Sequence, residues 1–365
     1  MKNNNTAITY NYQSIERKTR NTALRYLFGK LGVQFLKSIF QFIPGIDNSI
    51  YKKGASDTLF VEIVPSFLGM FTKHWEIKMK TVTRFLSLGV SVRSMHAPWI
   101  DDGKIYQTAR KSYLENVLDL TENVSATWNC LFSHVQLYSV LAPKEQEKVL
   151  IVHPLPAKPG KTEKEMIQTI SAVVKKTLPV LQGENVRLVV ENMPWLKKHH
   201  EEYTAFLGDA LFFDRLMNEV NSPFYGVLFD WGHANSFSRF MTMREIKHRE
   251  HFFSEEALSQ FEYQNYFIKR LTEKIFYGHL SFNEAHVKTA KAPFYAKNYD
   301  SHYDLTWLQE DEYLFYRKNV LALAHCPSLV GMTIESIPSY VSRRKRIQRY
   351  RDSVEILNSM LQSGS

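Results

Sequence analysis

The sequence has little cysteine and no long apolar run. Only two of its 365 residues are cysteines, Cys130 and Cys326, and they stand in no metal-ligand spacing. This scarcity argues against a disulfide framework and favours a reducing cytoplasm. No run of about 18 uncharged residues occurs, and the polar start Met1–Thr6 lacks the apolar segment of a signal peptide. We therefore expect a cytoplasmic protein that does not engage a membrane.

The composition is that of an ordinary globular protein with an excess of positive charge. Apolar residues make up 44% of the chain, enough for one large barrel or two medium domains. The formal net charge is +9, which favours anionic partners such as DNA or a phosphorylated small molecule. The basic runs 17–20 and 343–346 are typical of solvated faces. We expect a monomer.

Short β-rich runs alternate with helical patterns along most of the chain. Strands are expected at residues 58–64, 90–95, 149–152, 186–190, 224–229, 275–277 and 329–334. Thr162 and Glu165 form a capping box that opens a helix reaching about Leu181. At the C-terminus, apolar residues from Ile347 to Leu361 recur on one helical face. This alternation predicts the α/β class, as a single (β/α)8 TIM barrel.

The first strand is the least legible element of this pattern. The run Leu31–Leu36 suits a strand, although its apolar spacing also suits a helix. We expect an N-terminal extension over residues 1–28 and the barrel over residues 29–365. An enlarged insert, residues 236–273, is expected between strands six and seven.

Metal-ligand residue types stand at the carboxyl end of six successive predicted strands. The residues are His96, His153, Glu191, Asp230 (with His233 three positions later), His279 and Glu335. Each one taken alone has an ordinary alternative, because such side chains also cap helices or satisfy loop backbones. A parallel barrel, however, brings all its strand ends to one rim, where its active site lies. The joint pattern therefore predicts a metal site at that rim.

These residues resemble the metal ligands of endonuclease IV, the AP endonuclease family 2 of the xylose-isomerase-like barrels, over roughly residues 58–340. The resemblance extends to Asp300 and His302, which form an Asp-x-His motif within 298–303. It implies up to three zinc ions, although manganese or iron would suit the same ligand types. The implied ligand sets are His96, His153 and Glu191 for the first ion, Glu191, Asp230, His279 and Glu335 for the second, and His233, Asp300 and His302 for the third.

The resemblance also implies an activity. It implies a metal-dependent phosphodiester hydrolase that cleaves DNA at abasic sites, with Glu191 and Glu335 as the catalytic carboxylates that hold a metal-activated hydroxide. A sugar or sugar-phosphate isomerase or epimerase is the alternative. It would need only the second ion, and Glu191 and Glu335 would relay protons. Asp300 and His302 favour the hydrolase, because a single-metal enzyme does not use them. A barrel that only binds an anionic ligand is a third possibility.

Overall fold

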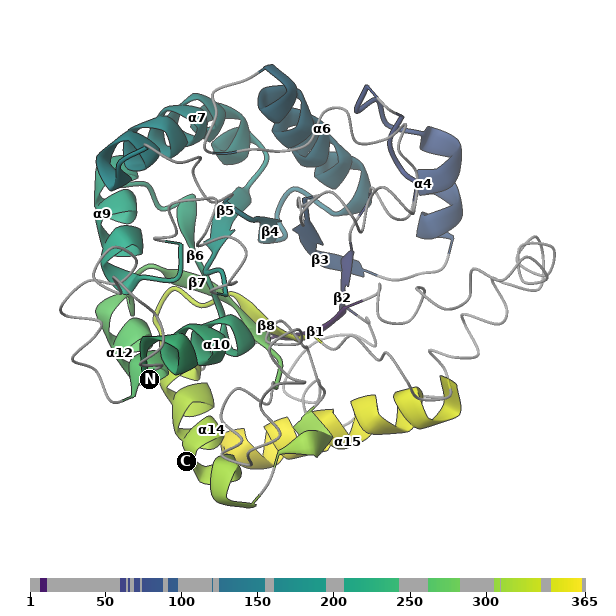
Figure 1. Cartoon of the computed structure of the whole chain (residues 1–365). Helices are drawn as coiled ribbons and strands as arrows, with labels where there is room; N and C mark the ends of the chain where they lie inside the picture. Colours follow the sequence, from purple (N-terminus) through teal and green to yellow (C-terminus); the bar gives the residue numbers. More distant parts are fainter. Residues whose placement is uncertain are drawn as a thin grey trace.

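The protein folds as a closed barrel of eight parallel strands, numbered in the order in which they neighbour one another (Figure 1). The computed structural model describes residues 7–11, 60–63, 65, 69–72, 74–87, 91–97, 120, 125–154, 161–194, 207–242, 262–282, 305–308, 310–335 and 343–362. The strands are β1 Ala7–Asn11, β2 Phe60–Ile63, β3 Ser91–His96, β4 Lys148–Val152, β5 Val186–Glu191, β6 Tyr225–Asp230, β7 Ile275–Leu280 and β8 Gly331–Ile334. Pairing of β1 with both β2 and β8 closes the barrel.

Helices surround the barrel on its outer side (Figure 1). They are α4 Met79–Leu86, α6 Ser125–Leu141, α7 Glu163–Gly183, α9 Ala210–Val220, α10 Trp231–Thr242, α12 Tyr263–Arg270, α14 Glu310–Ala324 and α15 Arg343–Gln362. The predicted capping box is present, since Thr162 accepts a hydrogen bond from the Glu165 backbone and Glu165 accepts one from the Thr162 backbone. Within the described residues, no helix is both long and apolar enough to cross a membrane.

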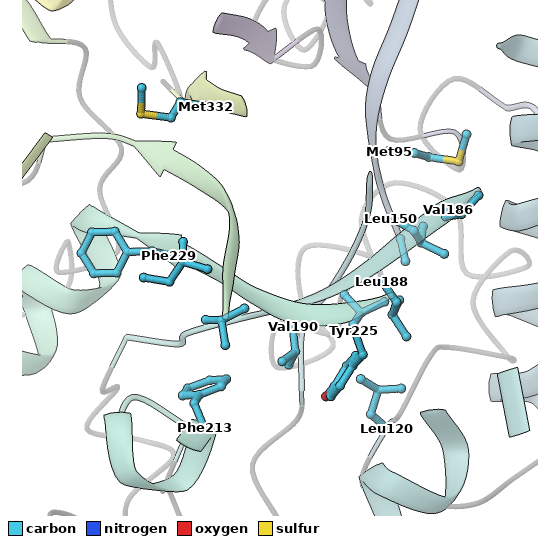
Figure 2. Close-up of a cluster of buried hydrophobic side chains, with 14 of the residues drawn as sticks. Met95, Leu120, Leu150, Val186, Leu188, Val190, Phe213, Tyr225, Phe229 and Met332 are labelled. Carbon is cyan, nitrogen blue, oxygen red and sulfur yellow. The ribbon is translucent and has the colours of Figure 1, made fainter. Parts of the chain in front are cut away.

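Alternation along the strands divides the apolar side chains into two layers. On β5, Val186, Leu188 and Val190 are buried in the large cluster between the strands and the helices (Figure 2). The intervening Val189 belongs to a separate small cluster, together with Val149, Ile151, Leu228, Phe276, Tyr277 and Val330. Because successive side chains of a strand point to opposite faces, this second cluster fills the barrel interior. On β7 it includes the successive residues Phe276 and Tyr277, because the register with β6 shifts there by one residue. Glu191 has the same parity as Val189, so it points into the barrel as well.

The first strand lies elsewhere than expected. β1 is Ala7–Asn11, inside the segment expected to be an extension, and not Leu31–Leu36, which lies outside the described residues. Of the two alternatives left open for Leu31–Leu36, the one that made it the first barrel strand is therefore wrong. The physical reason is that a strand of five residues between polar segments leaves a weak sequence pattern, and its place is fixed by pairing with β2 and β8.

Two helices lie in the described part of the segment between β6 and β7. α10 begins directly after β6, and α12 precedes β7. Residues 243–261 of the expected insert lie outside the described residues.

The single TIM barrel predicted from the alternation of strands and helices is confirmed.

Candidate metal centre

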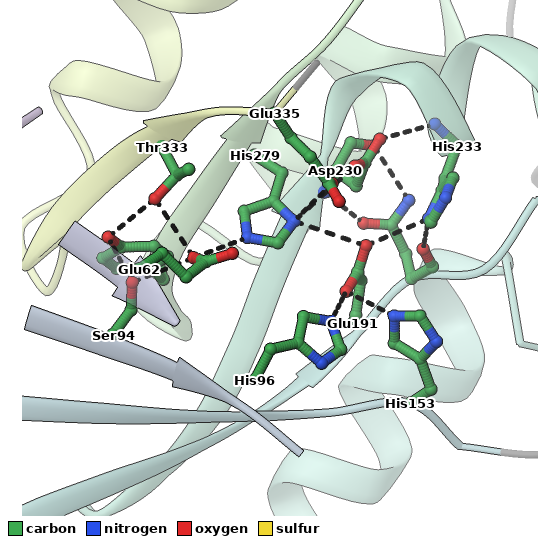
Figure 3. Close-up of polar contacts among 12 residues, drawn as sticks. Glu62, Ser94, His96, His153, Glu191, Asp230, His233, His279, Thr333 and Glu335 are labelled. Carbon is green, nitrogen blue, oxygen red and sulfur yellow. Dashed lines mark hydrogen bonds and ion pairs between the residues drawn. The ribbon is translucent and has the colours of Figure 1, made fainter. Parts of the chain in front are cut away.

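Six parallel strands deliver the predicted ligands to one rim of the barrel (Figure 3). His96, Glu191 and Asp230 are the last residues of β3, β5 and β6, and His279 is the penultimate residue of β7. The remaining two, His153 and Glu335, directly follow β4 and β8. His96, Glu191, Asp230 and His279 are buried, whereas the side chains of His153 and Glu335 are 12% and 13% exposed. Of the six ligands, these two are therefore the ones that solvent reaches most.

One group of ligand atoms consists of His96, His153 and Glu191. One atom from each residue lies within 4.8 Å of the others, a spacing that suits a shared metal ion. Nε2 of His153 and Nε2 of His96 lie 2.8 Å and 3.4 Å from Oε2 of Glu191. His96 donates from Nδ1 to the carbonyl oxygen of Ala97 at 2.7 Å, which leaves its Nε2 directed at the carboxylate.

A second group consists of Glu191, Asp230, His279 and Glu335, and it shares Glu191 with the first. Nδ1 of His279 lies 3.0 Å from Glu335 Oε2, 3.6 Å from Glu191 Oε1 and 3.8 Å from Asp230 Oδ2. Its other ring nitrogen, Nε2, lies 3.1 Å from Oε2 of Glu62. Nδ1 is therefore the atom of His279 that faces the three carboxylates.

The electrostatics of the cluster require positive charge among these groups. Burial works to lower the pKa of His279, but Glu62, Glu335 and Glu191 outweigh it and raise that pKa well above its ordinary value. Burial likewise works to raise the pKa of Glu191, but His153 and His279 hold it well below its usual range. Two buried carboxylates and a third, mostly buried one around a single imidazole nitrogen are stable only with a proton or a metal cation between them. The nitrogen and oxygen donors fit zinc, and they also fit manganese or iron.

The predicted third ligand set is only partly described. His233 lies in the first turn of α10, is buried, and has Nδ1 2.7 Å from the carbonyl oxygen of Asn192 and 3.2 Å from Oε1 of Glu191. Asp300 and His302 lie outside the described residues. The third ion therefore stays a prediction, whereas His233 does lie beside the cluster.

Sequence reasoning missed two polar residues that support the ligands. Glu62, on β2, is buried beneath the cluster and contacts His279. Asn192 bridges β5 and β6, because its side chain accepts from the backbone nitrogen of Asp230 at 2.7 Å and donates to the carbonyl oxygen of Asp230 at 3.1 Å. Glu62 had a signal, since it is the only charged residue of the run 58–64. Asn192 had none beyond its position after Glu191.

Solved structures similar to this one are barrels of several activities. A D-tagatose 3-epimerase-like protein is 15% identical, with a TM-score of 0.51, and the match covers 84% of this chain and 92% of that one. The IOLI protein with a bound zinc atom is 12% identical, with a TM-score of 0.50 and coverage of 97% and 98%. An AP endonuclease of family 2 from Brucella melitensis is 11% identical, with a TM-score of 0.50 and coverage of 93% and 96%. At these identities the likeness shows the fold.

A family assignment comes from the sequence itself. No curated protein matches the chain. The sequence model of the xylose isomerase-like TIM barrel matches residues 95–307, more than half of the chain and the stretch that holds all the described ligands except Glu335. The protein therefore belongs to the xylose isomerase-like TIM barrel family.

Proposed function

We propose that this protein is a metal-dependent phosphodiester hydrolase that binds at least two divalent cations, preferably zinc, and incises DNA at abasic sites. The observation that carries the proposal is the position of Glu191, whose carboxylate belongs to both groups of ligand atoms. A carboxylate shared between two groups suits a pair of ions held close together. Two such ions, when bound, lower the pKa of a water molecule and neutralise the attacking and leaving oxygens of a phosphodiester.

The chain's own residues have distinct tasks in this proposal. Glu191 holds the two ion positions at a fixed separation, because β5 places it between the imidazoles of His153 and His279. Glu335 lies at the more open side of the second group, with its side chain 13% exposed, and is placed to orient a reacting water against the substrate phosphorus. The buried imidazoles exclude bulk water from the inner side, which strengthens the electrostatic attraction between the site and the phosphate.

The DNA substrate is supported by charge and by likeness. A net charge of +9 suits a polyanionic backbone, and DNA binding of this kind weakens steeply with salt. The AP endonuclease and the zinc-containing protein among the similar structures agree with a phosphodiester substrate and with zinc.

A single-metal sugar or sugar-phosphate epimerase or isomerase is the second candidate. It is favoured by the second group, which contains four ligands and is complete without the first, and by an epimerase-like protein of the same fold. In a single-metal epimerase or isomerase, His96 and His153 would have no chemical task, although Nε2 of each points at Glu191. For this reason we place it second.

The deciding experiment compares two substrates. Protein as purified is assayed on an abasic-site duplex at low salt, and in parallel for solvent proton exchange into ketoses and their phosphates. The hydrolase predicts incision 5′ to the lesion that is abolished by chelation, by Glu335→Gln and by His153→Ala. Proton exchange that survives His153→Ala, with the duplex uncut, would establish the epimerase. Metal-free protein without turnover in either assay would indicate a barrel that only binds. His302→Ala tests the third ion, since its loss should lower the metal content by one.

A further inference from the structure

Glu62 lies on the inner side of the metal centre and contacts only one of its ligands directly. It is 1% exposed, and its Oε2 lies 3.1 Å from Nε2 of His279 (Figure 3). A carboxylate oxygen has no proton to donate in its ionised form, so the imidazole donates from Nε2. That contact leaves Nδ1 of His279 directed at Asp230, Glu191 and Glu335.

Three hydroxyl groups fix the position of the Glu62 carboxylate. Ser94 and Thr333 donate to the same oxygen, Oε2, at 2.9 Å and 3.1 Å. The hydroxyl of Tyr277 lies 3.0 Å from both of these hydroxyls and closes a ring beneath the rim. The ring draws on β2, β3, β7 and β8, and all of its members are buried. The two hydroxyls and the imidazole hold Oε2 of Glu62 in place, whereas its Oε1 is buried without a hydrogen-bond partner in the described part of the chain.

We propose that Glu62 is a positioning residue of the metal centre: it keeps the proton of His279 on Nε2 and thereby presents Nδ1 as the ligand of the second ion. Histidine ligands commonly donate their other nitrogen to a carboxylate, which sets the tautomer and raises the basicity of the ligating nitrogen. The inference rests on the metal centre of the proposed function but not on its substrate.

The hydrogen bond of Glu62 goes to a ligand of one ion, His279, while its charge also acts on His96 of the other group. His96 takes its own orientation from the carbonyl oxygen of Ala97, and His233 takes its own from the carbonyl oxygen of Asn192. Changing Glu62 should therefore weaken the ion held by Glu191, Asp230, His279 and Glu335 more than the ion held by His96 and His153.

Three substitutions separate the position of the oxygen from its charge. Glu62→Gln keeps the side-chain length and an acceptor oxygen, so it should lower the affinity for the second ion by no more than about tenfold. Glu62→Asp keeps the charge but moves the carboxylate oxygen away from His279. Glu62→Leu removes the carboxylate altogether. Both should lower that affinity by about 10- to 100-fold. Competitive zinc titration against a chromogenic chelator, followed by cobalt(II) spectra of each site, measures the two affinities separately.

The tautomer itself is the second readout. In zinc-loaded wild type, a long-range proton–nitrogen NMR spectrum should show His279 protonated at Nε2, and Glu62→Gln should keep this signature. Glu62→Asp and Glu62→Leu should lose it. Ser353→Ala is the matched control, because it removes a buried hydrogen bond to the backbone nitrogen of Leu305 on the helical layer. It should destabilise the protein yet leave both metal affinities and the His279 spectrum unchanged.

Two results would overturn the inference in distinguishable ways. Wild type that binds two ions, with folded Glu62→Asp and Glu62→Leu variants that bind both equally well and keep the Nε2 proton, would refute the role of Glu62 alone. Wild type that binds no metal would refute the proposed function and this inference with it.

Discussion

Asp230 caps the helix that carries His233. Its Oδ1 accepts a hydrogen bond from the backbone nitrogen of His233 at 2.7 Å, while Oδ2 faces Nδ1 of His279 at 3.8 Å. An Asp-x-x-His sequence has two separate explanations, a helix N-cap and a pair of metal ligands, and here one carboxylate serves both roles. β6 runs into α10 without a loop, so the cap and the ligand lie at the same point of the chain.

The two roles of Asp230 are separable by mutation. Asp230→Asn keeps an oxygen that caps α10 but lowers the charge that faces the second ion. It should therefore lose that ion while the unfolding free energy of the metal-free protein changes little. Asp230→Ala should lose the ion and also cost about 1 kcal/mol through the missing cap. Elemental analysis and chelator-treated urea unfolding measure the two effects. Equal stability of both variants would show that the cap contributes nothing.

Glu191 should be the one ligand whose loss empties both positions. Glu191→Gln is expected to reduce the metal content of the purified protein by two ions per chain, because both ligand groups contain this carboxylate. His153→Ala and Glu335→Gln each belong to one group and should each remove one ion. Inductively coupled plasma mass spectrometry on the three variants provides the measurement. A loss of only one ion in Glu191→Gln would contradict a shared carboxylate.

His134 should make stability depend on pH below neutrality. It is buried on α6 against Phe71 and Trp75, with Nδ1 2.7 Å from the carbonyl oxygen of Cys130. Burial lowers its pKa to about 4, although the Cys130 carbonyl opposes this shift, and His96 lowers the pKa further. Between pH 6.5 and pH 4, His134 is therefore protonated in the unfolded chain but neutral in the folded chain. The free energy of unfolding falls as the pH drops through this range.

This effect has a measurable size. Between pH 7.5 and pH 5, wild type should lose about 2 kcal/mol more unfolding free energy than His134→Leu, which has no titrating group there. Urea unfolding with a chelator present measures the difference. His325→Leu controls for the general cost of the replacement, because His325 makes the same contact to a carbonyl four residues earlier from an exposed position. Parallel pH profiles of wild type and His134→Leu would refute the prediction.

Gly226 should tolerate no side chain. A Cβ at this position of β6 would lie 2.6 Å from Cδ2 of Phe276 and 2.7 Å from the carbonyl oxygen of Lys274. Lys274 directly precedes β7, and its backbone cannot withdraw easily because it accepts a hydrogen bond from the backbone nitrogen of Val227. Gly226→Ala is expected to cost about 1–3 kcal/mol of stability. Gly183→Ala is the matched control, because no atom lies within 4 Å of its added Cβ. It should be neutral or stabilise the protein by up to about 1 kcal/mol. Thermal unfolding of both variants tests the pair, and equal melting temperatures would contradict it.

The strands that carry the ligands are recognisable from the order of residues along the chain. β4, β5, β6 and β8 are predominantly apolar and end on or just before a histidine or a carboxylate, and strands buried on both faces produce this pattern. Parallel strands in a barrel share a rim, so the convergence of His96, His153, Glu191, Asp230, His279 and Glu335 followed from chain order alone. Residues 243–261, Asp300 and His302 lie outside the described residues, so what the sequence predicts for them stays a prediction.

Contacts between distant parts of the chain fix what lies beneath that rim and where the barrel begins. β1 owes its place to pairing with β2 and β8, which join segments from opposite ends of the chain. The contact between Glu62 and His279 joins residues 217 positions apart, so no local sequence pattern predicts it. Likewise, Nδ1 rather than Nε2 of His279 faces the other ligands because Nε2 contacts the carboxylate of Glu62. A linear sequence specifies which chemical groups are present, whereas the hydrogen-bond partner of each ring nitrogen is fixed when distant strands close the barrel.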